Sequence, residues 1–363
     1  MHAYESLLKK TEMRDKLVVF CLEYDPKSIL VSHSFYWIQE LSKHFDKTSV
    51  VCVRANNFKD GNVEEVIQLG GGSTYLRLKG LFKLLAFTIR VSRKRQSTIL
   101  FHHMLIQPLA FFGWIYRLMR IPQVLWYSHS ACSPTLKIGT KFCDAVVSPS
   151  SACFPIANTG KLFEVGHGVS FERFASQDEN SNRRRDIVVL GRISQIKNIE
   201  ALIHAVASHK LTTNREIAID LIGPILDEEY GESLKDLARS KNVELNFVGV
   251  RNSTEIPADL GRYRYSYNGN PRTLDKSAVE AAFAGCLILS EVLPVLTLTG
   301  MEEIWMELGV PGPKLSDQLR ILDDIGEEAY ENYKKKLIET SRKNNELSGT
   351  ILRITEVLQR VSQ

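Results

Sequence analysis

The sequence predicts an α/β fold in which two doubly wound halves face each other across a cleft. Short apolar runs alternate with stretches whose apolar residues recur at helical spacing, which is typical of parallel strands joined by helices. At 363 residues the chain is longer than one hydrophobic core usually serves, so we expect two domains. The composition, with 44% hydrophobic and 24% charged residues, is that of a globular protein.

The expected elements follow in order from the apolar runs. In the first half, strands are expected at 16–22, 48–53, 98–101, 123–127, 145–148 and 162–165. One helix is expected at about 35–44, and an apolar helix is expected after Met104 and up to Arg120. In the second half, strands are expected at 187–190, 217–222, 243–248 and 287–290, with helices between them and a polar helical tail. We therefore expect an N-terminal Rossmann-like, acceptor-side domain over 1–170, a polar linker over 171–185 and a nucleotide-sugar-binding domain over 186–345. A C-terminal helix covers 346–363, and packing back on the first domain is one option for it.

The stretch 186–198 carries the clearest functional signal. A buried strand ends at Gly191, and Arg192 and Lys197 lie in the short connection before the next helix. Free backbone N–H groups and the helix dipole favour anions at such a junction, and two cations suit a diphosphate better than a single carboxylate. The alternative is an ordinary turn with two solvated cations.

A second motif lies in the stretch 270–289, which reads as a loop, a helix and a buried strand. The helix contains Glu280-Ala-Ala-Phe-Ala-Gly285. Together with the segment from Gly191 to Asn198, this motif resembles the glycogen-synthase-like (group 1) family of retaining, nucleotide-sugar-dependent glycosyltransferases with the GT-B fold. The two motifs stand in the family's order and at a similar separation.

The resemblance implies roles for individual residues. Arg192 and Lys197 would stabilise the charge that develops on the leaving diphosphate, and Glu280 would bind the ribose hydroxyls. The donor site would also contain Gly191, Asp275, Lys276 and Ser277. The family has a glutamate eight residues before the position of Glu280, in contact with the donor sugar, where this chain has Arg272. That contact therefore does not carry over, and Arg272 is only a possible site residue. Asp275 has the alternative role of a helix N-cap.

His129 is the candidate catalytic residue of the first domain. It follows the strand at 123–127, on the edge where α/β sheets present functional side chains, and similar enzymes place a histidine near the donor sugar. His103 ends the neighbouring strand and is the second candidate, whereas His167 is expected to be structural. For His129, a purely structural hydrogen-bonding role is the alternative.

No metal ion or other cofactor is expected. Cationic side chains would stabilise the diphosphate in place of a metal. The six cysteines show neither Cys-x-x-Cys pairs nor histidines at metal spacing, as in a cytosolic protein with reduced thiols. The resemblance implies transfer with retention, and no carboxylate pair indicates a covalent double displacement.

Charge is distributed unevenly along the chain. The net charge is +4, yet the segment from Val66 to Cys143 contains eleven Lys and Arg residues and no Asp or Glu. From 75 to 95 these cations interleave with Leu and Phe, which suits an anionic membrane surface. A core-facing helix with a solvated basic side is the alternative. No nucleic-acid-binding motif accompanies the charge, so nucleic acid is not an expected partner.

Targeting signals are not evident in the sequence. The N-terminus lacks an apolar secretory core, and no apolar run is long enough to span a membrane. We therefore expect a cytoplasmic protein, with peripheral attachment to the inner face of the membrane as an option. The expected activity is transfer of a sugar from a nucleotide-diphosphate donor to a lipid-linked or envelope glycan. A sugar-nucleotide epimerase, a phosphorylase and a non-catalytic sugar-nucleotide-binding protein remain as alternatives.

Overall fold

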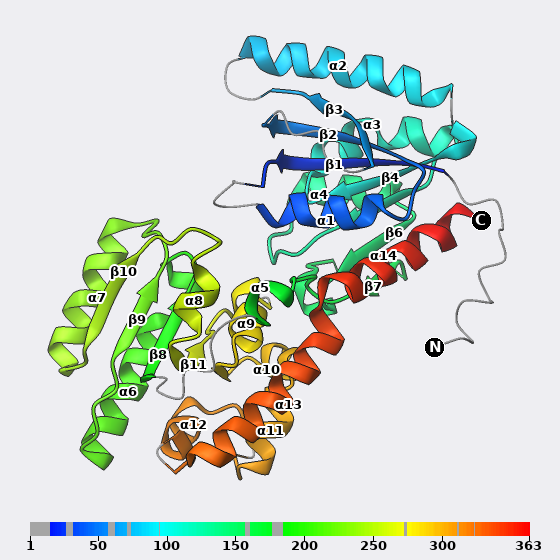
Figure 1. The fold of residues 1–363 in the computed structure, drawn as a ribbon. Coiled ribbons are helices and arrows are strands. Elements are labelled where there is room, and N and C mark those ends of the chain that lie inside the picture. The colour runs from blue at the N-terminus through cyan, green and yellow to red at the C-terminus, as the bar shows by residue number, and fades with distance from the viewer. Residues whose placement is uncertain are drawn as a thin grey trace, which may run out of the picture. The chain divides into compact units, whose positions relative to one another are not determined.

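The computed structural model forms two compact units. It describes residues 15–26, 32–56, 62–70, 74–93, 95–156, 160–175, 184–271, 274–310, 312–322 and 324–363. Unit 1 contains Met1–Val165 with Ile351–Gln363, and unit 2 contains Gly166–Thr350 (Figure 1). Each unit is a parallel sheet with helices on its faces.

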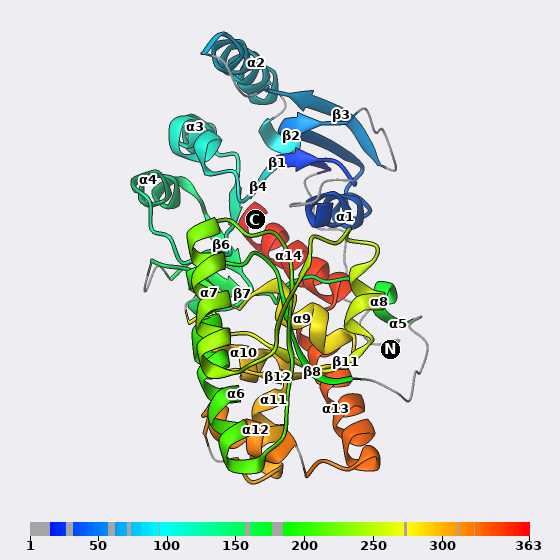
Figure 2. The ribbon, with the colours of Figure 1, turned by 90° about the vertical axis from the view of Figure 1, so that its left-hand side faces the viewer.

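Unit 1 is built on a seven-stranded sheet in the order β3-β2-β1-β4-β5-β6-β7. The strands are β1 (Lys16–Tyr24), β2 (Lys47–Ala55), β3 (Val63–Gln68), β4 (Thr98–His103), β5 (Gln123–Trp126), β6 (Ala145–Ser148) and β7 (Leu162–Glu164). The helices are α1 (Ser32–Ser42), α2 (Thr74–Ser92), α3 (Ile106–Leu118), α4 (Pro134–Phe142) and, from Ile351 onward, α14 (Leu347–Ser362). Helices α3 and α4 cover one face of this sheet, and α1 and α14 cover the other (Figure 2).

Unit 2 is built on a five-stranded sheet in the order β10-β9-β8-β11-β12. The strands are β8 (Arg184–Leu190), β9 (Ile219–Ile222), β10 (Leu245–Gly249), β11 (Tyr263–Tyr267) and β12 (Leu287–Leu289). The helices are α5 (Glu172–Ala175), α6 (Ile199–Thr213), α7 (Glu228–Lys241), α8 (Ile256–Leu260), α9 (Lys276–Phe283), α10 (Leu293–Thr299), α11 (Met301–Glu307), α12 (Leu315–Leu322) and α13 (Glu327–Asn345).

Strands β3 and β11 have no counterpart among the elements expected from the sequence. Strand β3 is an edge strand whose sequence, VEEVIQ, is half-exposed and contains two glutamates. Strand β11 is central and fully buried, but its sequence is YRYSY. Its Arg264 is buried because Glu327 pairs with it and the ring of Tyr330 lies 4.9 Å from its guanidinium carbon. An apolar-run criterion misses both kinds of strand.

Strand order identifies the edge of unit 2 where a ligand is expected. The chain runs from β8 outward to β9 and β10, and then crosses to β11 on the other side of β8. Open α/β sheets bind ligands outside the carboxyl ends of their strands, at the point where this change of direction occurs. The carboxyl ends of β8 and β11 flank that point in unit 2. The residues that follow these two strands therefore form the candidate site.

Candidate functional site

Three glycines form the floor of the site. Gly191 follows β8, Gly223 follows β9 and Gly249 ends β10, and their φ angles are +115°, +148° and +89°. Their backbones are packed together: the N–H of Gly191 donates to Ile222, the N–H of Gly223 donates to Gly249, and a Cβ on Gly223 would lie 2.1 Å from the carbonyl oxygen of Gly191. Three neighbouring strands thus end at residues that lack a side chain, which lets a ligand approach the backbone closely. We call Gly191, Gly223 and Gly249 the glycine edge. The sequence indicated only Gly191.

Lys197 lies under this glycine edge with its ammonium group held in place. The residue is 8% exposed and ends a short 3₁₀ turn, after which Asn198 (φ 49°) turns the chain into α6. Its Nζ donates to the carbonyl of Leu190 at 3.1 Å, to Asp275 Oδ2 at 2.7 Å and to Ser277 Oγ at 3.3 Å. The three donors of the ammonium group are therefore engaged. A Cβ on Gly191 would come within 3.1 Å of the same Nζ.

Asp275 is the counterion of Lys197. Its other oxygen, Oδ1, accepts from Asn270 Nδ2 at 2.8 Å. Burial acts to raise the pKa of Asp275, but the charge of Lys197 and the hydrogen bonds from Lys197 and Asn270 outweigh it and hold the pKa below its usual value. Asp275 stands at the N-cap position of α9 and makes no side-chain cap hydrogen bond there. These contacts connect the loop before α9 to the turn after β8.

Arg192 has the opposite environment from Lys197. Its side chain is exposed, and its guanidinium has no hydrogen-bond or ion-pair partner among the residues that the structure describes. Five N–H donors are therefore free one residue beyond Gly191. The two cations that the sequence placed together thus differ: the ammonium of Lys197 is fixed by an ion pair and hydrogen bonds, and the guanidinium of Arg192 is available to a ligand.

Helix α9 completes the site. Glu280 is 6% exposed, and its Oε1 lies 2.8 Å from Lys276 Nζ. Lys276, Ser277 and Asp275 all come from the same helix start, so every described residue predicted for the donor site in this domain lies on β8–α6 or on β11–α9. Arg272 lies outside the described residues. Groups of three or more side chains that could hold a metal ion are absent from the described part of the chain.

His167 is tied to the same loop from the start of unit 2. Its ring Nε2 lies 2.9 Å from the carbonyl of Leu274, to which it donates, and its backbone N–H donates to Asn345 Oδ1 at 3.2 Å. Burial lowers the pKa of His167, an effect that the hydrogen bond to Leu274 only partly opposes. The ring is therefore neutral near pH 7 and positions the residue before Asp275, in line with the structural role expected for it.

In unit 1, His129 is exposed in the loop after β5. Its backbone N–H donates to the carbonyl of Cys153, and its ring Nδ1 accepts from the backbone N–H of Ala131 at 2.9 Å. Because Nδ1 is an acceptor, the neutral ring carries its proton on Nε2. His129 is thus set up to donate a hydrogen bond through Nε2 and not to remove a proton there.

His103 is placed differently from His129. It ends β4 but is only 2% exposed, in an aromatic cluster with Trp37 and Trp126 at centroid distances of 5.3 and 6.2 Å. Burial lowers the pKa of His103 to about 4. The ring is a neutral part of the core of unit 1, and the structure gives it no access to a substrate from solvent.

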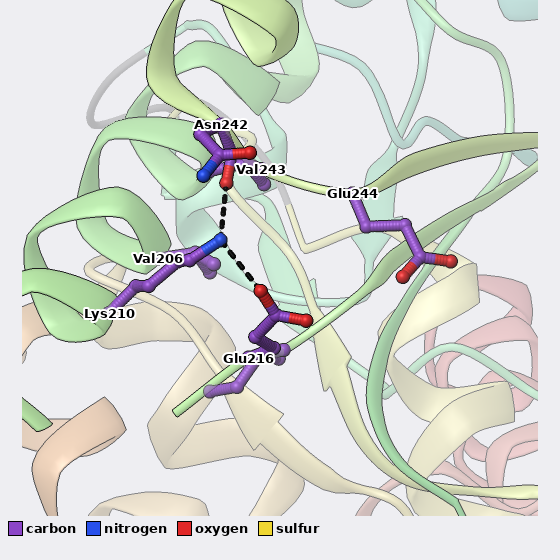
Figure 3. A pocket seen from close by; sticks show the side chains of 7 residues that line it. Val206, Lys210, Glu216, Asn242, Val243 and Glu244 are labelled. Carbon is purple, nitrogen blue, oxygen red and sulfur yellow. Dashed lines mark hydrogen bonds and ion pairs between the residues drawn. The ribbon is translucent and has the colours of Figure 1, made fainter. Parts of the chain in front are cut away.

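A separate hollow of about 220 Å³ lies at the opposite edge of the sheet of unit 2, near the amino ends of β9 and β10 (Figure 3). Lys210 points between its other polar groups: Nζ lies 2.8 Å from Glu216 and donates to the carbonyl of Asn242 at 3.0 Å. These groups satisfy one another. The hollow contains none of the predicted site residues, and strand order places ligands at the other edge.

Comparison with known proteins identifies the fold. No family model and no curated protein sequence matches the chain. Among solved structures it is similar to Anabaena HepE in complex with UDP-glucose (13% identity, 95% of this chain and 99% of that one, TM-score 0.66). It is also similar to a glycosyltransferase from Rickettsia africae (12%, 96% and 98%, 0.69) and to trehalose 6-phosphate synthase from Burkholderia multivorans (11%, 96% and 97%, 0.67). The chain has the GT-B fold of these glycosyltransferases.

Proposed function

We propose that the chain is a nucleotide-sugar-dependent glycosyltransferase whose donor diphosphate binds at the glycine edge of unit 2. The observation that carries this proposal is the combination of Gly191, Gly223 and Gly249 with a buried ammonium beneath them and a free guanidinium beside them. Backbone groups at such an edge approach a diphosphate without obstruction, and a guanidinium forms paired hydrogen bonds with its oxygens. The solved structures of similar fold include complexes with UDP and UDP-glucose, which supports a nucleotide sugar as the ligand.

The chemistry follows from charge. Breaking the bond between sugar and diphosphate leaves negative charge on the phosphate oxygens. Arg192 would pair with these oxygens, and the fixed charge of Lys197 would act on them through the glycine edge. Glu280 would accept from the ribose hydroxyls, and the first N–H groups of α9 would face the diphosphate. His129 would donate from Nε2 to an oxygen of the donor sugar. In this scheme transfer proceeds with retention and without a metal ion.

The acceptor that we propose is a lipid-linked or envelope glycan. The support is the basic and apolar surface of α2 and the turn after it, where Lys79 and Arg93 are exposed together with Leu and Phe side chains. An acceptor of this kind is met at a membrane, and the enzyme would act as a peripheral protein on its inner face. Every helix that the structure describes is too short or too polar to span a bilayer.

A donor panel with an arginine variant tests the proposed reaction. Nucleotide sugars with different bases and hexoses are incubated with the protein, and release of the nucleoside diphosphate is measured. Arg192→Ala should lower the turnover of the preferred donor by about 100-fold, because removing one electrostatic contact at a reacting centre typically costs ~2–4 kcal/mol. Arg239→Ala is the matched control, since Arg239 is an exposed arginine of α7 that forms a surface ion pair with Asp236. Equal turnover in the two variants would refute the assignment.

A non-catalytic sugar-nucleotide-binding protein is the second candidate. It is favoured by the engagement of all three donors of Lys197 within the protein. Calorimetry distinguishes the two functions. One result would support the binding protein and contradict the transferase: nucleotides bind and need Arg192, but no mixture of donor and acceptor releases the nucleoside diphosphate.

A further inference from the structure

Helices α2 and α3 of unit 1 form one continuous outer surface. The hydroxyls of Thr88 on α2 and Tyr116 on α3 are 2.7 Å apart, and Leu84, Phe87 and Val91 of α2 lie in the same core cluster as Tyr116. Figure 2 shows the two helices nearly end-on, side by side, with α4 beyond α3. The sides of both helices that face away from this core are open to solvent.

The outer side of α3 is apolar. Phe111, Trp114 and Leu118 are 66%, 49% and 77% exposed and follow one another at spacings of three and four residues, so they form one stripe. The helix is held against α4 by a close approach at Gly113, where a Cβ would lie 2.9 Å from that of Phe142. The stripe is therefore presented on a firmly packed helix. A pattern of cations interleaved with apolar residues indicates α2 and does not reveal this stripe on α3.

The outer side of α2 continues this apolar surface toward α3. Leu81, Leu85 and Ile89 are between 43% and 51% exposed and recur every four residues, so they form one stripe, and helical spacing places Leu81 and Leu85 beside Thr88, the residue that contacts α3. Two cations of the helix lie on its other side: Lys83 donates to the carbonyl of Gln68, Arg90 forms an ion pair with Glu65, and both of these partners belong to β3. The apolar stripe of α2 is thus directed to the same surface as that of α3.

The charge around this surface indicates its partner. Arg117 of α3 and Lys137 and Lys141 of α4 are exposed beside the stripe, and the segment 66–143 contains no acidic residue. A second copy of the chain would bring the same cations against one another, because a two-fold interface pairs each patch with itself. An anionic bilayer accepts both features, since the apolar side chains enter the interface and the cations meet its headgroups.

We infer that the surface formed by Leu81, Leu85, Ile89, Phe111, Trp114 and Leu118 docks on an anionic lipid bilayer. This inference goes beyond sugar transfer and does not depend on it, because docking needs neither donor nor acceptor. The inference also moves the expected membrane contact, which the sequence placed at 75–95. The apolar stripe of α3 inserts, and the cations of α4 and the end of α3 assist, whereas two cations of α2 are engaged with β3.

Trp114 provides a direct probe. The other three tryptophans, Trp37, Trp126 and Trp305, are all at most 3% exposed. Vesicles of phosphatidylglycerol with phosphatidylcholine, added at about 50 mM salt, should therefore shift the emission of Trp114 to shorter wavelength, and brominated lipid should quench it. Raising the salt to about 500 mM should release much of the protein, because screening shortens the range of its charges. Trp114→Phe should lose the emission change and retain most of the binding.

Paired variants test the surface. The double variant Phe111→Ser/Leu118→Ser should lower the vesicle partition coefficient at least about tenfold, since two large apolar side chains no longer enter the interface. The control is Leu211→Ser/Met306→Ser, which changes two exposed apolar side chains of unit 2 and should bind like the unchanged protein. Arg117→Glu/Lys141→Glu should abolish the preference for anionic over neutral vesicles.

Three outcomes would overturn the inference. The first is the absence of flotation with anionic vesicles at low salt. The second is equal partition of the Phe111/Leu118 double variant and its control. The third is a dimer in solution that the double variant dissociates, without vesicle binding by the unchanged protein, because the surface would then join two copies. Donor turnover is measured in parallel, so that loss of docking is distinguished from loss of the transferase site.

Discussion

The ion pair between Lys197 and Asp275 makes a quantitative prediction about unit 2. Asp275→Asn keeps the shape of the side chain and removes its charge, which leaves the ammonium of Lys197 buried without a counterion. The side chains of Lys197 and Asp275 are 10% and 21% exposed, with Nζ and Oδ2 2.7 Å apart. Breaking a fully buried pair by changing one partner costs about 3–5 kcal/mol. Partial exposure reduces this figure, so we expect a loss of about 2 kcal/mol.

Scanning calorimetry at pH 7 is the appropriate assay, because the two units need not unfold together. For a unit of this size, 2 kcal/mol corresponds to a decrease in Tm of about 4–8 °C. Asp236→Asn is the matched control, since Asp236 pairs with Arg239 on the surface of α7 and both side chains are more than 70% exposed. It should change the free energy of unfolding by less than about 1 kcal/mol.

The dependence on pH provides a second test of the same pair. The pKa of Asp275 in the folded protein lies below its usual value, so the folded state binds fewer protons than the unfolded state as the pH falls. The stability from this carboxylate is therefore fully present above about pH 4 and is lost as the pH falls through the lowered pKa. The difference in free energy of unfolding between the unchanged protein and Asp275→Asn should be constant near neutral pH and should decrease in acid.

A double-mutant cycle identifies the origin of the effect. Lys197→Met in the Asp275→Asn background removes the uncompensated charge and should restore part of the lost stability. If Asp275→Asn melts at the same temperature as its surface control, or if Lys197→Met adds its full cost to that of Asp275→Asn, the pair does not stabilise unit 2 and the reasoning is wrong.

Three further predictions concern single features of the two units. Glu280→Gln should weaken nucleotide binding in calorimetry, because an ionised carboxylate suits paired hydroxyl donors; unchanged affinity would make this residue structural. Gly223→Ala should strongly destabilise unit 2, since its Cβ would meet a backbone oxygen at 2.1 Å, whereas Gly312→Ala meets nothing within 4 Å and should leave the Tm nearly unchanged. Burial lowers the pKa values of His102 and His103 to about 3 and about 4. Both rings stay neutral in the folded state while the unfolded state gains protons below about pH 6.5, so unit 1 should lose about 2 kcal/mol per ring by pH 5 in urea titrations. A free energy of unfolding that does not change between pH 7 and pH 5 would contradict this.

The α/β class, most of the strands and the two cations after β8 were predictable because they depend on local patterns. An apolar run that ends at a glycine marks a buried strand wherever it occurs. Strand β11 was not predictable in this way, since its Arg264 becomes acceptable in the interior only through Glu327 and Tyr330, which lie more than sixty residues further along the chain. Gly223 after β9 and Gly249 at the end of β10 became recognisable as part of the candidate site only when strand order placed them beside Gly191.

The difference between Arg192 and Lys197 was also beyond the sequence, and it changes how the proposed site works. Both residues follow β8, so a pattern of charges treats them alike. The structure fixes the ammonium of Lys197 through Leu190, Asp275 and Ser277, and leaves the guanidinium of Arg192 exposed. A fixed buried charge stabilises a transition state without reorganising, whereas an exposed side chain can take up a donor and release a product. Gly191 matters for both residues. A Cβ at this position would lie 3.1 Å from Nζ of Lys197 and would cover the backbone next to Arg192. A glycine therefore stands after β8 for two reasons: the backbone there has a φ of +115°, which residues with a side chain rarely adopt, and a Cβ would approach the Lys197 ammonium.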